Sequence, residues 1–296
     1  MIFTVKTRIL ASATLLVAIA TAQAQQGPDW ASIEFSHTDL GNGIYMLQGR
    51  GGNLGLSVGD DGAFLIDDEF PQMASKAVET IAEITDAPVE YLVNTHWHGD
   101  HTGGNAVFHS HGSRILAHDN VRVRMAAPGP QQSAPQALPE LTYSEHATLH
   151  FNGHDIHLMH VSDAHTDGDT VVHFRNLNVI HTGDVMFNGM YPFIDLDSGG
   201  TVSGYIDALK LIANLADEQT QIIPGHGPLA GKEDVQTTIK MLQDTRAAVA
   251  PHVAAGKTLE EVLEAQPLAA FDEAYSWAFI NGPRFTATLY NDLKAQ

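Results

Sequence analysis

The sequence predicts an α/β protein, and three observations lead to that class. Short apolar runs separated by glycine-rich and acidic turns occupy residues 44–67, and a second set occupies about 146–182. A helical pattern lies between the two sets, and the C-terminal third is largely helical in pattern. Strand sets that alternate with helices favour a fold of packed layers.

The first strand set divides into three strands, over 44–48, 54–58 and 63–67. Each run has an apolar centre, and Gly-Gly-Asn or Gly-Asp-Asp-Gly separates it from the next. The second break, at 59–62, predicts a hairpin because glycine and aspartate suit tight turns.

A helix is predicted next, over 73–85, where Ala77, Ile81 and Ile84 share one side. Residues 89–95 follow with a β-favouring run that suits a buried strand. We expect the polar residues directly after this strand to lie at the edge of a sheet.

The remaining segments divide into an irregular stretch and a helical third. Residues 126–139 contain so much proline and glutamine that regular structure is excluded. This stretch is predicted to be either a flap over the functional site or a plain surface loop. Helices are predicted over 201–216, 231–254, 258–264 and 283–294.

The most informative segment is Thr95-His-Trp-His-Gly-Asp-His-Thr-Gly-Gly104, which carries His96, His98, Asp100 and His101. Imidazole and carboxylate are ligands that borderline divalent metals such as zinc select. If the chain stays extended after the strand, His96 and His98 point to the same face. Gly99 is predicted to permit a sharp turn that re-aims Asp100 and His101.

Three further candidate ligands lie downstream, each in a short turn. His165 stands in a polar turn at 162–169, Asp184 follows the strand-like run 179–183, and His226 lies in a Gly/Pro loop at 222–228. Seven such side chains divide naturally into two adjacent coordination spheres, so the sequence predicts a two-metal hydrolase. Threonines beside these ligands are candidates for supporting hydrogen bonds, namely Thr95, Thr166 and Thr182.

Other histidines are predicted to have no ligand role. The chain has 17 of them, so some close pairs arise by chance. We interpret His109 and His111 as surface or strand-face residues, together with the loose cluster His154, His157 and His160. His181 is interpreted as structural.

The chain resembles the metallo-β-lactamase superfamily over roughly 44–231, through the motif His-X-His-X-Asp-His and the later His, Asp and His. The resemblance implies a four-layer αββα sandwich with metals at one edge between the sheets. It also implies roles for all seven side chains. His96, His98 and His165 would hold the first metal, Asp100, His101 and His226 the second, and Asp184 would bridge them.

Two Zn²⁺ ions per chain are the expected cofactors, with iron or manganese as alternatives that the ligand types also accept. The resemblance implies that a metal-bridging hydroxide is the nucleophile. Asp100 is then the candidate catalytic residue, because it is well placed to orient the hydroxide and to pass a proton to the leaving atom.

Residues 1–24 are predicted to be a cleavable secretory signal. Lys6 and Arg8 form a basic start, 9–20 is apolar, and Ala22-Gln23-Ala24 is a small-residue cleavage site. No other segment approaches the ~20 apolar residues of a membrane span. The rest, 25–296, is predicted to be one hydrolase domain that works in the periplasm or outside the cell.

The amino-acid composition and net charge limit the classes of substrate that we expect. The chain has no cysteine, so it has neither a disulfide nor a thiolate ligand. The formal net charge is −20, and loss of Lys6 and Arg8 would make it −22. Such a charge repels nucleic acid and strongly anionic substrates, which argues against nuclease and phosphodiesterase activity. A small molecule is expected as the substrate, and the acidic composition does not indicate the oligomeric state.

The leading prediction is a periplasmic dinuclear zinc hydrolase that cleaves a cyclic amide or ester, either a β-lactam or a lactone. The seven-ligand set is also similar to the glyoxalase II arrangement, which implies a thioester hydrolase as an alternative. An iron-dependent oxidoreductase or sulfur-metabolising relative on the same scaffold is the third. The candidates for substrate contact are Trp97, Asn188, Met190, Tyr191, Phe193 and Arg284.

Overall fold

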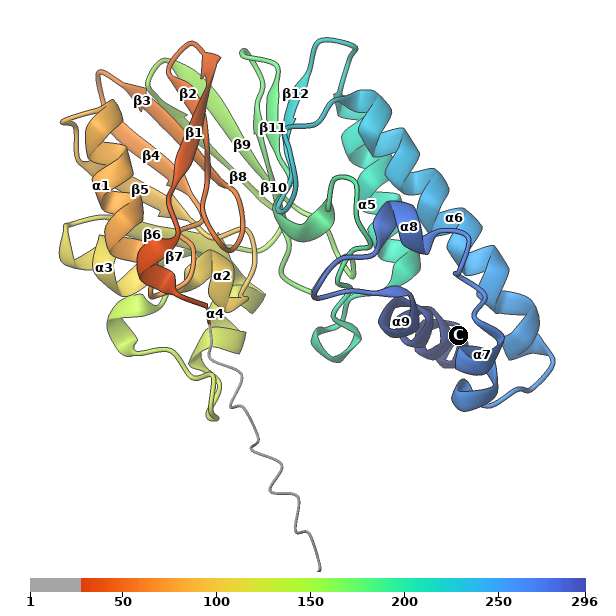
Figure 1. Cartoon of the computed structure of the whole chain (residues 1–296). Helices are drawn as coiled ribbons and strands as arrows, with labels where there is room; N and C mark the ends of the chain where they lie inside the picture. Colours follow the sequence, from red (N-terminus) through yellow and green to blue (C-terminus); the bar gives the residue numbers. More distant parts are fainter. Residues whose placement is uncertain (1–27) are drawn as a thin grey trace, which may run out of the picture.

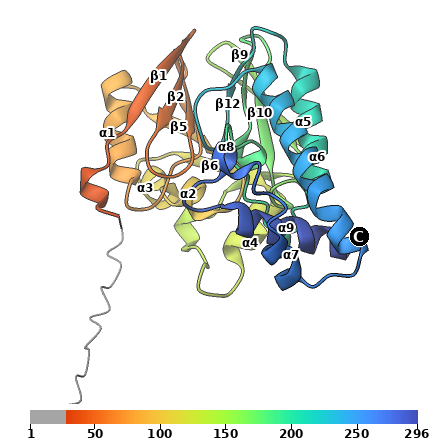
Figure 2. The same cartoon turned by 45° about the vertical axis from the view of Figure 1, so that its right-hand side comes forward.

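The computed structural model describes residues 28–296, so the predicted signal at 1–24 lies outside the described residues. Two β-sheets pack face to face, and helices cover their outer faces (Figure 1). This is the α/β fold with four αββα layers that the sequence predicted. Figure 2 shows the same two sheets after a turn of 45°, with the C-terminal helices packed beside the second sheet.

The first sheet has seven strands in chain order. Its first four strands are antiparallel, and the last four, β4 to β7, are parallel. The hairpin predicted at 59–62 is confirmed, because Gly59 pairs with Gly62. The strands are β1 (Ser36–Gly41), β2 (Ile44–Gln48), β3 (Leu54–Gly59), β4 (Gly62–Ile66), β5 (Val89–Val93), β6 (Arg114–His118) and β7 (Leu141–Tyr143).

The second sheet has five strands in the order β12-β11-β10-β9-β8. β11 and β12 pair in parallel, which brings the ends of two strands distant in sequence to the same edge. The strands are β8 (His146–Phe151), β9 (His154–His160), β10 (Thr170–Phe174), β11 (Val179–His181) and β12 (Gln221–Ile223).

Helices occupy all five segments over which the sequence predicted them with stated bounds. The predicted helix at 73–85 is α1, and the four predicted C-terminal helices are α5, α6, α7 and α9. The helices are α1 (Ala74–Ile84), α2 (Gly99–Thr102), α3 (Asn105–Ser110), α4 (Asp119–Ala126), α5 (Val202–Leu215), α6 (Lys232–Ala254), α7 (Leu259–Ala265), α8 (Asp272–Tyr275) and α9 (Gly282–Ala295).

Apolar cores between the sheets and outside each of them hold the four layers together. Between the sheets, Phe64 of β4 meets Phe174 of β10 edge to face at 6.3 Å between ring centroids. Outside the first sheet, Ile81 of α1 packs on the strands, and outside the second sheet Leu209 of α5 does so. Burial of these side chains provides the main driving force for the layering.

Among the elements that the sequence analysis did not predict are β1, β6 and α4. β1 is almost wholly exposed and polar, so it has no apolar alternation to detect. β6 and α4 follow each other directly, at 114–118 and 119–126, and neither is long enough to show a period. The stretch 126–139 is irregular apart from one 3₁₀ turn at Pro135–Ala137, as predicted. No helix among residues 28–296 is long and apolar enough to cross a membrane.

Candidate metal centre

All seven predicted ligand residues lie together at one edge of the sandwich, on segments that follow strands. His96 and His98 follow β5, whereas Asp100 and His101 lie on the short helix α2. The other three come from the second sheet. His165 lies in the loop between β9 and β10, Asp184 in a 3₁₀ turn after β11, and His226 in the loop after β12.

The prediction that Gly99 permits a sharp turn through the conformational freedom of glycine is wrong. Gly99 is the first residue of α2, its φ is not positive, and a Cβ at this position would meet open space. A turn of helix therefore re-aims Asp100 and His101. Glycine is required instead at Gly52 and Gly225, where a Cβ would overlap the His101 ring and the Asp184 carboxylate.

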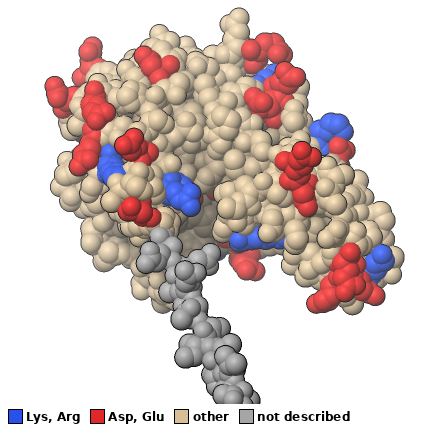
Figure 3. Space-filling model, in the orientation of Figure 1, with Lys and Arg blue, Asp and Glu red and all other residues tan. Residues whose placement is uncertain are grey.

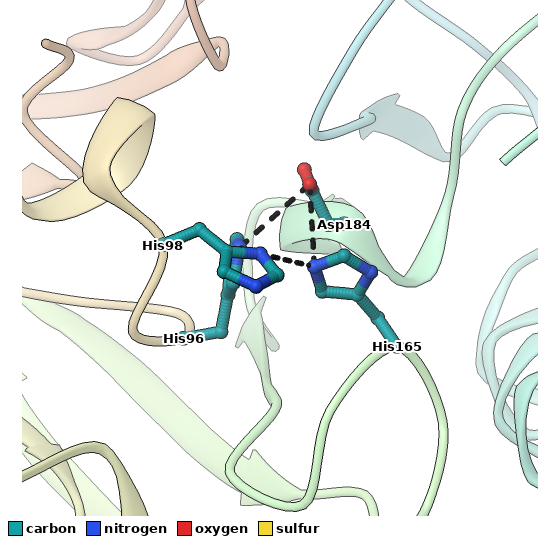
Figure 4. Close-up of side chains that lie close together, drawn as sticks. All are labelled: His96, His98, His165 and Asp184. Atoms are coloured by element: carbon teal, nitrogen blue, oxygen red, sulfur yellow. Dashed lines mark hydrogen bonds and ion pairs between the residues drawn. The ribbon is translucent and has the colours of Figure 1, made fainter. Parts of the chain in front are cut away.

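The first group of ligands is His96, His98, His165 and Asp184, shown in Figure 4. Nδ1 of His98 lies 3.1 Å from Nε2 of His96 and 2.8 Å from Nε2 of His165. Oδ2 of Asp184 lies 3.7 Å and 3.5 Å from the same two Nε2 atoms. Four potential ligand atoms thus face one small space.

The second group is Asp100, His101 and His226. Nε2 of His226 lies 3.3 Å from Oδ2 of Asp100 and 3.4 Å from Oδ1 of Asp184. Oδ1 of Asp184 is also 3.0 Å from Nε2 of His101. The two carboxylate oxygens of Asp184 therefore face different groups, which is the arrangement that a bridging ligand needs.

Hydrogen bonds on the far side of each ring indicate which nitrogen is free. Nδ1 of His165 donates to the carbonyl of Phe193 at 2.7 Å, and Nε2 of His98 lies 3.0 Å from Oδ2 of Asp195. Because a carbonyl or carboxylate only accepts, these nitrogens carry the protons. The facing atoms, His165 Nε2 and His98 Nδ1, then present two lone pairs to each other.

The two remaining rings of the motif are oriented in a similar way. Nδ1 of His101 donates to Oδ2 of Asp67 at 2.7 Å, so its Nε2 faces Oδ1 of Asp184. Thr95 donates its hydroxyl to Asp67, so its oxygen accepts from Nδ1 of His96. One nitrogen of each ring thus points into the centre.

This arrangement fits a pair of cations. His101 Nε2 and Asp184 Oδ1 are buried and have no hydrogen-bond partner among residues 28–296. This pair, 3.0 Å apart, needs a positive charge between its two atoms. A metal ion supplies that charge when bound; otherwise a proton on His101 does, because burial lowers the pKa of His101 but the charges of Asp184, Asp100 and Asp67 outweigh it and raise that pKa. Nitrogen and carboxylate ligands in this number suit zinc, iron or manganese, so the residues present fit the metals that the sequence predicted.

Burial and neighbouring charges shift the pKa values of the histidines in the two groups. Burial lowers the pKa of His165 to about 4 and that of His96 well below its usual range, which favours the neutral, metal-binding form. Burial also lowers the pKa of His226, but the Asp184 charge and the Asp100 hydrogen bond outweigh it and raise that pKa to about 9. The carboxylates thus attract positive charge to the second group.

A cavity of about 570 Å³ opens over the two groups. Asp100, Asp184, His98 and His226 form part of its lining. Figure 3 shows the hollow between the two halves of the molecule, with basic side chains at its border. The stretch 126–139 does not line the cavity and lies against α3 instead, so it is a surface loop rather than a flap.

Of the six predicted substrate contacts, only Phe193 lines the cavity. Trp97 packs near Ala117 under α4, and the buried Tyr191 donates to Asp272. Sequence reasoning missed the rings that form most of the cavity wall, namely Trp30, Phe70, Phe187, Trp277 and Phe279. Those from segments 28–30 and 277–279 lie far from the motif in sequence.

Sequence reasoning also missed two supporting carboxylates. Asp67 contacts Thr95 and His101, and Asp195 contacts His98. For Asp67 the sequence held a usable signal, because an acidic run, Asp67-Asp68-Glu69, directly follows the apolar strand β4. The structure buries all three side chains, which is unusual for acidic residues.

The candidate threonines and His181 have different partners. Thr95 reaches a predicted ligand, whereas Thr166 bonds Asp169 and Thr182 bonds the backbone. His181 is buried, with hydrogen bonds to the backbone of Asn53 and Gly183. These contacts are consistent with the structural role predicted for His181.

The fold and this site define a class of enzyme. Residues 47–226 match the family model of the metallo-β-lactamase superfamily, and the chain belongs to that superfamily, whose members are metal-dependent hydrolases. The 2,4-dinitroanisole O-demethylase subunit alpha of Nocardioides sp. (strain JS1661) is 24% identical over 175 residues. That match covers 58% of this chain and 51% of the relative, so the chain matches about half of that relative's length.

Two other relatives share more of their length with this chain. The acyl-coenzyme A thioesterase MBLAC2 of Gallus gallus is 25% identical over 232 residues, which is 67% of this chain and 83% of the relative. A metallo-β-lactamase from Pseudomonas aeruginosa, crystallised in a mono-zinc form, superposes with a TM-score of 0.58 at 21% identity. This superposition covers 71% of this chain and 95% of that one, and it demonstrates a shared fold.

Proposed function

We propose that the chain is a dinuclear zinc hydrolase that cleaves a cyclic amide or ester, a β-lactam or a lactone. One observation carries the proposal. The two oxygens of Asp184 face two separate groups of imidazole and carboxylate atoms, at 3.0 Å from His101 and 3.5 Å from His165. Two cations would be held side by side by such a bridge.

His96, His98 and His165 would hold the first ion, Asp100, His101 and His226 the second, and Asp184 both. When bound, a zinc pair supplies Lewis acidity that acidifies water and polarises the scissile carbonyl. The chain offers no serine or cysteine nucleophile in the cavity lining of the described residues, which is consistent with direct attack by water.

Asp100 is the candidate catalytic residue. It lines the cavity and its side chain is 22% exposed, unlike His101 and Asp184, which are buried. Burial raises the pKa of Asp100, but the charge on His101 and the hydrogen bond with His226 outweigh it and hold that pKa below its usual value. A carboxylate that faces the substrate in this way can orient the attacking water and accept its proton.

The location of the enzyme, its domain organisation and its substrate class are also proposed here. We propose that the enzyme is exported after removal of residues 1–24, that 25–296 form one domain, and that its substrate is a small molecule. A thioester is the second candidate substrate, because the relative from Gallus gallus is named a thioesterase and matches over 83% of its length.

Metal content and hydrolysis, measured on the same preparation, test the proposal. Two zinc ions per chain with chelator-sensitive cleavage of a chromogenic cephalosporin or a simple lactone are expected. One iron per chain and no hydrolysis would contradict it. For Asp100, the variant Asp100→Asn, assayed at a zinc concentration at which metal analysis finds both ions bound, is expected to lose at least about a hundredfold in kcat. Unchanged turnover with both ions bound would remove Asp100 from the mechanism.

A further inference from the structure

The cavity wall is made of aromatic rings, which a site for hydrolysis does not by itself require. Besides the four residues of the metal groups and Arg50, the lining side chains are all apolar, and most are Trp or Phe. Several of these rings are only partly buried, and Phe279 is 47% exposed. Large aromatic side chains gathered around a cavity and left accessible are typical of a ligand-binding surface.

The rings form a continuous arc that begins at a predicted metal ligand. Phe187 stacks on His226, with 4.8 Å between ring centroids and 19° between ring planes. Trp277 follows, 6.0 Å from Phe187 and 6.1 Å from His226. The wall therefore starts directly beside the second group of ligands.

The arc ends at a ligand of the first group. Phe279 lies 5.6 Å from Trp277, and Phe193 lies 5.5 Å from Phe279 in an edge-to-face contact. The ring of Phe193 is 5.6 Å from that of His98. These four aromatic residues, Phe187, Trp277, Phe279 and Phe193, are called the aromatic arc below. The arc spans the distance between the two metal groups on one side of the cavity.

The aromatic arc is held in place before any ligand arrives. Nε1 of Trp277 donates to the carbonyl of Tyr191 at 2.9 Å. The guanidinium of Arg284 lies 4.0 Å from the ring centroid of Phe279 and 5.5 Å from that of Phe193. Rings fixed in this way lose little conformational entropy when a ligand binds.

A second pair of rings also lines the cavity. Trp30 and Phe70 meet edge to face at 5.5 Å between centroids. A flat group in the cavity therefore has aromatic surface available beyond the arc. Ring faces and edges attract another ring more strongly than they attract a flexible alkyl chain of equal area.

We propose that the substrate carries an aryl group within a few bonds of the scissile carbonyl, and that this ring binds against the aromatic arc. The inference rests on the proposed hydrolytic function and specifies its substrate class. With the ring against the arc, the scissile carbonyl would face Asp100 and Asp184, which line the same cavity.

A substrate series tests this proposal. γ-Butyrolactone is compared with its α-phenyl and α-cyclohexyl derivatives, and ring opening is followed by proton release. The α-phenyl compound is expected to exceed the parent in kcat/KM by about tenfold or more, the scale of a well-filled apolar pocket. If the α-phenyl compound and the parent lactone have equal kcat/KM values, the proposal is overturned. Equal kcat/KM values for the α-phenyl and α-cyclohexyl compounds would also overturn it.

Binding measured without catalysis separates this inference from the proposed function. Phenylacetamide and cyclohexylacetamide are titrated by calorimetry into both the chelator-treated and the zinc-loaded protein. The phenyl compound is expected to bind about tenfold more tightly. If this preference holds while no lactone or lactam is cleaved, the proposed function fails and the aryl site remains. Cleavage without any aryl preference would overturn the aryl site and support the hydrolytic function.

Matched Phe→Leu variants locate the binding surface. Phe279→Leu, at a half-exposed position, is expected to weaken phenylacetamide binding about three- to tenfold and to leave acetamide binding unchanged. Phe271→Leu serves as the control, since Phe271 lies outside the cavity lining and packs on the core beneath the helices. Equal losses in the two variants would show a general effect on folding and would overturn the assignment.

Discussion

Oδ2 of Asp67 accepts a hydrogen bond from Nδ1 of His101 at 2.7 Å, and neither side chain is exposed. The same carboxylate accepts from the backbone N–H and the hydroxyl of Thr95, both at 2.7 Å. Through these contacts one buried aspartate sets the orientation of two imidazoles, because Thr95 in turn contacts His96. Asp67 is therefore a positioning residue for both metal groups.

Replacement of Asp67 by Asn is expected to weaken metal binding by about 10- to 100-fold, the usual effect of losing such a partner. An amide retains the shape but presents one donor to groups that also donate. Competition with a chromophoric chelator measures the affinity of each ion. Asp60→Asn, at an exposed position in the hairpin between β3 and β4, is the control and should match the parent. Unaltered affinity in Asp67→Asn would show that His101 is oriented by packing alone.

Removal of metal is expected to lower thermal stability. Nε2 of His165 and Nδ1 of His98 face each other as lone pairs at 2.8 Å, and their repulsion returns when the ions leave. At a free zinc concentration a hundredfold above Kd, a single bound ion contributes about 2.7 kcal/mol to the free energy of unfolding. Melting curves recorded with zinc, with chelator and after zinc is restored measure the effect. A melting temperature that is the same with zinc and with chelator would contradict a buried metal centre.

Two glycine substitutions should have opposite outcomes. Gly52→Ala places a Cβ on the His101 ring, so we expect that ring to shift and the second ion to bind at least about tenfold more weakly. Gly99→Ala lies within the motif itself, yet its Cβ would meet open space at the start of α2. We expect this variant to bind two ions normally. Metal analysis after dialysis distinguishes them, and similar results for both would refute the packing argument.

Glu69 shapes the cavity wall through the backbone. Its carboxylate accepts hydrogen bonds from the N–H groups of Arg50, Gly51 and Phe70, and its own φ is +70°. A side chain held in this backbone region typically costs about 1–3 kcal/mol, which the three hydrogen bonds offset. The loop that carries Arg50 is thereby fixed at the cavity.

Glu69→Gln is expected to raise KM several-fold with little change in kcat, because one of the three acceptor contacts becomes a clash between two donors. Steady-state kinetics on the preferred substrate give the two constants, and metal analysis should still find two ions. Glu140→Gln, at a half-exposed carboxylate far from the cavity, is the control. A fall in kcat with unchanged KM would place Glu69 in the chemistry instead.

Local patterns in the sequence were sufficient to predict much of the fold. Alternation and turn residues predicted the hairpin at Gly59 and Gly62, and a run of apolar positions predicted α1. These elements form where the sequence itself has a period. β1 lacks one because nearly every residue in it is exposed, so only its pairing with β2 makes it a strand.

Part of the candidate site was likewise predictable from the local sequence, and part was not. The residue types and spacing at 96–101 by themselves determined that imidazole and carboxylate ligands would gather after one strand, because metal chemistry restricts the ligands to a few side chains. The sequence also determined an α/β fold with two strand sets. The ligand role of the seven residues stays a prediction until metal is measured.

Only the tertiary structure decided how the two sheets meet. Parallel pairing of β11 with β12 brings Asp184 beside His226, and the facing of the sheets brings Asp184 to His96 and His226 to Asp100. It also places Trp30 and Trp277, which are 247 positions apart, on one cavity. Contacts across such distances depend on the whole packed core rather than on any local pattern, so the aromatic wall became visible only in three dimensions.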